Sequence, residues 1–121
     1  MSGLESAALL QAVAAAERGP RRDGAFAVWL VVRVAGDLAS EGEWPERTHR
    51  RRLQALERRL SSLSLSPPLR RALGAALALM RDCRPENAQA ALATLVGPVR
   101  ESVSPDAAEA IRRVVAGLRA R

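Results

Sequence analysis

Residues 45–63 read PERTHRRRLQALERRLSSL, and this stretch decides the fold class. A proline fits the first turn of a helix, because its missing N–H would have no partner there. Residues suited to burial then recur at alternating spacings of four and three, which places them on one helical face. The residues on this face are His49, Leu53, Leu56, Leu60 and Leu63. The stretch therefore predicts one amphipathic helix with a buried leucine face.

The sequence on both sides predicts further helices whose starts are marked by capping residues or prolines. Ser2 and Glu5 have the spacing of a capping box, and the helix that follows is expected to end near Arg18. Asp23 is expected to cap a second helix that ends near Gly42 and is apolar around most of its circumference, as central helices are. The three remaining starts are predicted at Ser66-Pro67, Pro85 and Ser104-Pro105, and Pro98 is expected to end or kink the helix that contains it.

Residues 26–34 are the one segment where a β-strand competes with a helix, because they are rich in β-branched and aromatic side chains. A lone strand would have no partner elsewhere in the chain, so the helical interpretation is preferred. The predicted fold is all-α, a bundle of five or six helices forming a single domain over residues 1–121.

An internal repeat is a second interpretation of the same helices. Residues 64–67 and 102–105 align as Ser-Leu-Ser-Pro and Ser-Val-Ser-Pro at an offset of 38. The chain then divides into stacked antiparallel helical hairpins at 1–43, 44–84 and 85–121. This period is similar to that of HEAT-type helical repeats, although no signature residue supports that family. Chance alignment of leucine-rich helices explains the pattern equally well.

Composition excludes several classes of protein. The 121 residues contain one cysteine, so no internal disulfide forms, and they lack a run of about 20 apolar residues, which a membrane span needs. No signal peptide is apparent, and the cytoplasm is the expected compartment. All nineteen basic residues are arginine, giving a net charge of +6. Codon bias in a GC-rich genome explains the missing lysine, and selection for guanidinium chemistry is the alternative.

Eight of the arginines fall between positions 47 and 71 and form the candidate partner-binding site, which we call the arginine ridge. It comprises Arg47, Arg50, Arg51, Arg52, Arg58, Arg59, Arg70 and Arg71. Helical geometry places Arg47, Arg51 and Arg58 opposite the leucine face. A solvated face that keeps the domain soluble is one interpretation. The other is a binding surface for an anionic partner, either an acidic protein surface or a nucleic-acid backbone.

The ridge lacks the residue patterns that usually accompany nucleic-acid recognition. It contains no interleaved aromatic residue for base stacking, no Asn or Gln pair for base edges and no helix-turn-helix spacing. The predicted function is therefore a non-enzymatic helical adaptor or regulatory module that presents an arginine-rich surface. The alternative is a small basic subunit of a nucleoprotein complex that holds RNA or DNA by its phosphates. Small helical subunits of CRISPR effector complexes are similar in size and charge, an analogy that rests on no motif.

No catalytic, cofactor-binding or metal site is predicted. His49 has no second histidine near it in sequence, and it is expected to pack at the helix start. Cys83, between Asp82 and Arg84, is expected to be an inert thiol. Trp44 is expected to cover the core at a hairpin junction, with a binding anchor as the alternative. Small residues recur along two further segments and suit either tight internal packing or a homodimer; they are Gly74, Ala75 and Ala78, and Ala107, Ala108 and Ala110.

Overall fold

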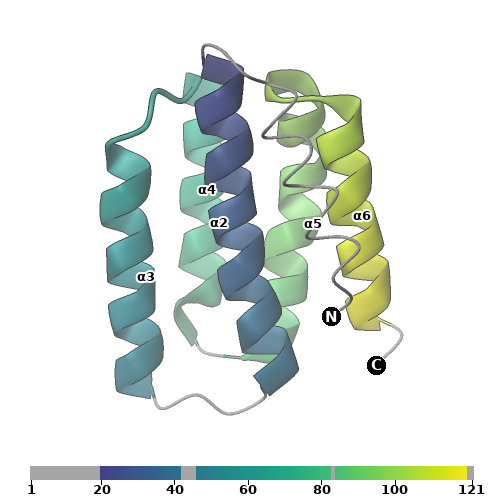
Figure 1. Cartoon of the computed structure of the whole chain (residues 1–121). Helices are drawn as coiled ribbons and strands as arrows, with labels where there is room; N and C mark the ends of the chain where they lie inside the picture. Colours follow the sequence, from purple (N-terminus) through teal and green to yellow (C-terminus); the bar gives the residue numbers. More distant parts are fainter. Residues whose placement is uncertain (1–19, 42–45, 83, 120–121) are drawn as a thin grey trace.

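The computed structural model describes residues 20–41, 46–82 and 84–119, and it is all-helical over that part of the chain. Five α-helices pack as an antiparallel bundle in which successive helices alternate in direction (Figure 1). Their bounds are α2 (Pro20–Glu41), α3 (Glu46–Ser61), α4 (Pro67–Leu79), α5 (Pro85–Ser102) and α6 (Pro105–Arg119), with a short 3-10 turn η1 (Met80–Asp82) after α4. The prediction of an all-α domain is confirmed for these residues. The helix predicted from Ser2, together with Trp44 and Cys83, lies outside them.

The predicted helix starts at the two Ser-Pro sequences are confirmed by their capping contacts. Ser66 precedes α4 with an extended backbone, and its Oγ accepts a hydrogen bond from the Leu69 N–H at 3.4 Å. At the start of α6, the Oγ of Ser104 accepts a hydrogen bond from the Ala107 N–H at 3.0 Å. Each proline that follows occupies a first-turn position that needs no backbone donor.

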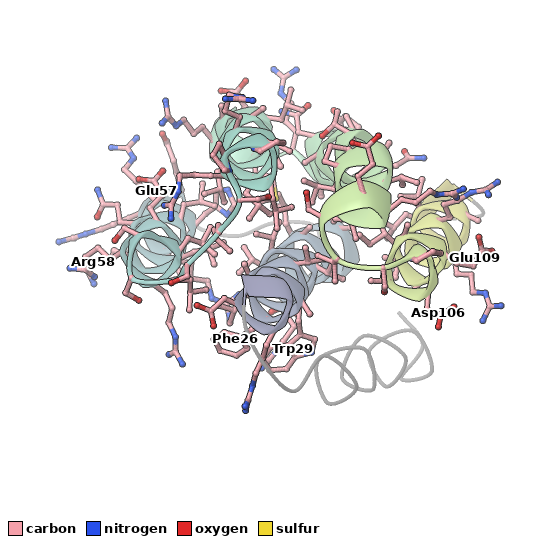
Figure 2. All side chains as sticks on the ribbon, turned by 90° about the horizontal axis from the view of Figure 1, so that it is seen from above. Phe26, Trp29, Glu57, Arg58, Asp106 and Glu109 are labelled. Atoms are coloured by element: carbon pink, nitrogen blue, oxygen red, sulfur yellow. The ribbon has the colours of Figure 1, made fainter. Side chains whose placement is uncertain are left out.

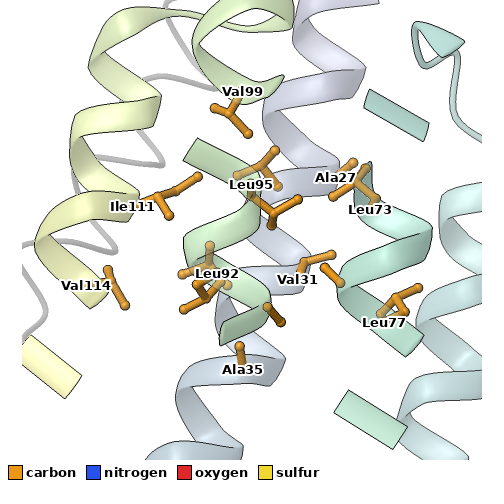
Figure 3. Packing of buried hydrophobic residues seen from close by; sticks show 14 of the residues in the cluster. Ala27, Val31, Ala35, Leu73, Leu77, Leu92, Leu95, Val99, Ile111 and Val114 are labelled. Atoms are coloured by element: carbon orange, nitrogen blue, oxygen red, sulfur yellow. The ribbon is translucent and has the colours of Figure 1, made fainter. Parts of the chain in front are cut away.

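Helix α2 contacts each of the other four described helices, in agreement with the central place that its apolar residues predicted. Its buried side chains are Ala25, Ala27, Val28, Val31, Val32, Ala35 and Leu38. Figure 3 shows Ala27, Val31 and Ala35 on α2 beside leucines of α4 and α5. The approach is close at Gly24, where an added Cβ would lie 3.0 Å from Leu69 Cδ2 and 3.2 Å from Val103 Cγ2. Small residues on α2 therefore let two neighbouring helices pack against it tightly.

The prediction that Asp23 caps α2 is wrong. The helix already includes Pro20, so Asp23 lies within its first turn. Its Oδ2 accepts a hydrogen bond from the Ser64 N–H at 2.7 Å instead. Ser64 belongs to the turn between α3 and α4, and Asp23 therefore fixes that turn to the start of the central helix.

The two sets of small residues differ in environment. Ala107, Ala108 and Ala110 are buried on α6, where they let its backbone approach α5 closely. Gly74, Ala75 and Ala78 on α4 are exposed. The small residues of α6 thus serve internal packing, and those of α4 face solvent.

Pro98 does not end α5, which continues to Ser102.

Helix α3 is attached more loosely than α6. Its backbone hardly approaches that of α4, whereas α5 and α6 run close together. Long side chains span the gap and form the buried face of α3, namely His49, Leu53, Leu56 and Leu60. The two hairpins that the repeat interpretation would equate therefore pack differently, and the structure does not show a repeat. Among the described helices, none is long and apolar enough to span a membrane.

Candidate interaction surface

All eight side chains of the arginine ridge are exposed. Six lie on α3, which forms one edge of the bundle, and Arg70 and Arg71 lie near the start of α4. Figure 2 shows side chains ending in nitrogen fanning out from α3, with Arg58 pointing away from the other helices. The leucine face determines this arrangement, because burying Leu53, Leu56 and Leu60 turns the arginines between them toward water.

Few carboxylates neutralise the ridge. Arg50 pairs with Glu46 at 2.7 Å within α3, and Arg52 reaches Asp37 of α2 at 3.4 Å. Both pairs are exposed and contribute little to stability. Among the described residues, no ion pair within 4 Å involves Arg47, Arg51 or Arg58. We call these three side chains the outward arginines; among the described residues they carry most of the charge of α3 that no carboxylate compensates.

Arg70 has a local structural role. Its guanidinium donates a hydrogen bond to the Leu63 carbonyl oxygen at 2.9 Å. Leu63 lies in the turn between α3 and α4, where Asp23 also binds the Ser64 N–H. Arg70 thus helps to close this turn, a role that its place in a run of basic residues did not indicate.

Two arginines lie over aromatic rings of α2. The Arg59 guanidinium lies over the Phe26 ring, 5.5 Å from its centroid, and Arg33 lies over Trp29 at 5.0 Å. Phe26 and Trp29 stack on each other with their centroids 5.9 Å apart and their planes 26° apart. We call this series Arg59, Phe26, Trp29 and Arg33 the cation–aromatic row, and Figure 2 shows its two rings side by side on the outer face of α2.

Sequence reasoning missed this row. From the sequence, only aromatic residues between the arginines of one helix were considered, whereas these rings come from the neighbouring helix. A signal was present for three of its members, because Phe26, Trp29 and Arg33 are spaced three and four apart and share one face of α2. Which arginine of α3 would join them depends on how the two helices pack, and the sequence does not state that.

His49 packs in the interior, in agreement with its predicted role. It is 3% exposed, and its Nε2 donates a hydrogen bond to the Met80 carbonyl oxygen, which belongs to η1. A carbonyl can only accept, so Nε2 carries the proton in this contact. The bond ties the first turns of α3 to the end of α4 across the gap between their backbones.

A hollow of about 440 Å³ lies beside this anchor and has mixed charge. Its lining residues are Glu46, Arg50, Leu53, Gln54, Glu57, Arg81 and Asp82. Arg50 is already paired with Glu46, and Arg81 lies 3.9 Å from Glu57. Within the described ranges, no three His, Cys, Asp or Glu side chains gather closely enough to hold a metal ion.

Comparison of the chain with known protein families, with curated proteins and with solved structures gave no match.

Proposed function

We propose that this protein is a non-enzymatic helical adaptor that binds an acidic protein surface through the arginine ridge. The supporting observation is that the outward arginines Arg47, Arg51 and Arg58 are exposed on an edge helix and make no ion pair within the described part of the chain. Guanidinium groups in this state can form two parallel hydrogen bonds with a carboxylate. A helix at the edge of the bundle can also contact a partner without displacing its neighbours.

A charge-matched pair of variants tests this proposal. Arg51→Glu with Arg58→Glu reverses two charges on α3, and Arg112→Glu with Arg113→Glu makes the same change on α6 at the opposite edge. All four side chains are exposed, so both variants are expected to fold. Circular dichroism checks this before binding is measured.

The binding measurement is affinity capture from native lysate treated with nuclease. We expect acidic proteins to be retained by the wild type and by the α6 variant, lost from the α3 variant, and released by salt because exposed charges are screened. Equal capture by both variants would overturn the proposal.

Binding to the phosphate backbone of RNA or DNA is the second candidate, and the same uncompensated arginines support it. Its signature is affinity for oligonucleotides that falls steeply with salt and is abolished by Arg51→Glu with Arg58→Glu. The cation–aromatic row favours the protein partner, because the rings of Phe26 and Trp29 already stack on each other and each has an arginine over it. Capture that disappears on nuclease treatment would favour the nucleic-acid candidate.

Two further expectations, on the cellular compartment and on a helical repeat, remain proposals. The cytoplasm remains the proposed compartment, supported by a composition with a single cysteine. The division of the chain into stacked antiparallel helical hairpins that form a short HEAT-like repeat also remains a proposal, supported by the matching Ser-Pro starts of α4 and α6 and by the capping bonds of Ser66 and Ser104.

A further inference from the structure

An open groove runs between α2 and α3, on the side of α3 next to the cation–aromatic row. Its volume is about 250 Å³. Its apolar lining is Leu30 and Val34 from α2 and Ala55 and Leu56 from α3. Leu30 and Val34 are half-buried and Ala55 is exposed, so apolar surface remains accessible here. The groove exists because α3 is held off by long side chains.

The rim of the groove is basic. Arg33 and Asp37 project from α2, and Arg52 and Arg59 project from α3. Asp37 and Arg52 face each other at 3.4 Å. Arg33 and Arg59 are the rim arginines that contact aromatic rings, and among the described residues neither of them pairs with a carboxylate.

Contact with the rings prepares Arg33 and Arg59 to bind a carboxylate. A guanidinium that lies over a ring is held there by cation–π attraction, and its N–H donors can still bind a carboxylate. Contact with the ring also restricts the side chain, which lowers the entropy lost when a ligand binds. The two arginines come from different helices, so each wall of the groove supplies one guanidinium group.

The combination of apolar floor and basic rim limits the class of ligand. A phosphate backbone would use the arginines but would leave Leu30, Val34 and Ala55 unburied. A volume of about 250 Å³ is also below the usual range of roughly 300–1,000 Å³ for cofactor and drug-sized sites. A few apolar side chains on one face of a peptide helix, flanked by carboxylates, satisfy both parts of the groove.

We propose that the groove between α2 and α3 binds an acidic amphipathic helix of the partner protein. Apolar residues of that helix lie on Leu30, Val34 and Ala55, and its carboxylates accept hydrogen bonds from Arg33 and Arg59. This inference rests on the proposed function, since it names the segment that the acidic partner inserts beside the ridge.

The test uses a fluorescent amphipathic peptide of about 15 residues, long enough to form a helix, with leucine on one face and glutamate on its flanks. Binding to the full chain is followed by anisotropy. One control peptide replaces glutamate with glutamine, and another has the same composition in scrambled order. We expect both controls to bind at least about tenfold more weakly, because the first lacks charge and the second lacks the apolar face.

Matched variants locate the binding site. Ala55→Glu places a carboxylate on the floor of the groove, and Ala78→Glu makes the same change on the exposed face of α4. We expect Ala55→Glu to weaken binding at least about tenfold and Ala78→Glu to change it less than about twofold. Arg33→Gln with Arg59→Gln is expected to weaken binding similarly.

The remaining outcomes separate this inference from the proposed function. The groove is excluded if the scrambled peptide binds as well as the amphipathic one, or if Ala55→Glu binds like the wild type. If Arg47→Gln, Arg51→Gln and Arg58→Gln together then abolish binding, the ridge proposal stands alone. Retention of peptide binding in that triple variant, with its loss in Ala55→Glu, supports the groove. An oligonucleotide that displaces the peptide from the wild type, and whose own affinity is unchanged by Ala55→Glu, would overturn the inference in favour of a phosphate ligand.

Discussion

Helices α3 and α6 form opposite edges of the bundle, and both are amphipathic, but they are attached by different means (Figure 1). Helix α6 buries alanines and approaches α5 closely at the backbone, whereas α3 is held at a distance by leucines and one histidine. On α6, Glu109 lies 3.5 Å from Arg112 and 4.0 Å from Arg113, which compensates charge within the helix. On α3, six arginines accompany only two glutamates. Helix α6 thus combines close packing with paired charge, whereas α3 combines open packing with arginines of which several form no ion pair among the described residues.

The largest effect is expected where α6 enters the core. Ile111 is fully buried, and Ile111→Ala should lower the free energy of unfolding by about 3 kcal/mol through lost burial and a residual cavity. Leu60→Ala on α3 should cost less, about 2 kcal/mol, because a loosely attached helix can relax into the space. Urea unfolding of both variants measures the difference. A larger cost for Leu60→Ala would contradict the comparison.

Replacing an alanine by leucine on each edge helix should show the difference in packing between α6 and α3 more clearly. Ala108 is fully buried on α6, so Ala108→Leu should overpack its contact region and lower stability by about 2 kcal/mol. Ala55 is exposed on α3, and Ala55→Leu should change stability by less than about 0.5 kcal/mol. Thermal unfolding midpoints report both effects. If Ala55→Leu destabilises the domain as much as Ala108→Leu does, α3 is not openly packed.

The histidine anchor of α3 should have an intermediate effect. His49→Phe keeps an aromatic ring but removes the donor to the Met80 carbonyl oxygen, and we expect a cost of about 1–2 kcal/mol. Gln54→Ala, at an exposed position of the same helix, is the control. In His49→Phe, amide hydrogen exchange relative to the wild type should accelerate more in α3 than in α6. Unchanged protection of α3 would mean that the leucines alone hold it.

The smallest effect is expected at the capping serine of α6. Ser104→Ala removes the acceptor for the Ala107 N–H and should cost about 1 kcal/mol, while Ser104→Asp should retain most of the stability. Ser61→Ala at the end of α3 removes only a contact from an exposed hydroxyl to the Arg58 carbonyl oxygen. Its unfolding midpoint should stay at the wild-type value. Equal losses for Ser104→Ala and Ser61→Ala would count against the capping role of Ser104.

Much of the fold follows from local patterns. Spacings of three and four residues predicted α3 and its buried face, and Ser-Pro pairs predicted where α4 and α6 begin, because both depend on neighbouring residues in the chain. The central place of α2 followed from its apolar circumference. Asp23 was misassigned because its partner, the Ser64 N–H, is 41 residues away, and an aspartate at a helix start normally binds its own helix.

The candidate site was predictable only in part. The exposure of the ridge followed from the leucine face of α3, and the structure agrees with it. The pairing of Arg59 with Phe26 and the groove beside them depend on the distance and rotation between α2 and α3. Those quantities arise from side-chain packing across the whole bundle, and no single segment encodes them.

The ridge consists entirely of guanidinium groups, and the chain contains no lysine. Arginine stays protonated throughout the physiological pH range, so the charge of this surface does not vary with compartment acidity. Lysine acetylation, which cells use to neutralise basic surfaces, has no side chain to act on here, and arginine methylation would leave the charge in place. Under the proposed function, an acidic partner would be released by ionic strength, by a competing anion, by a change in the partner, or by arginine methylation, which keeps the charge but blocks the two parallel hydrogen bonds.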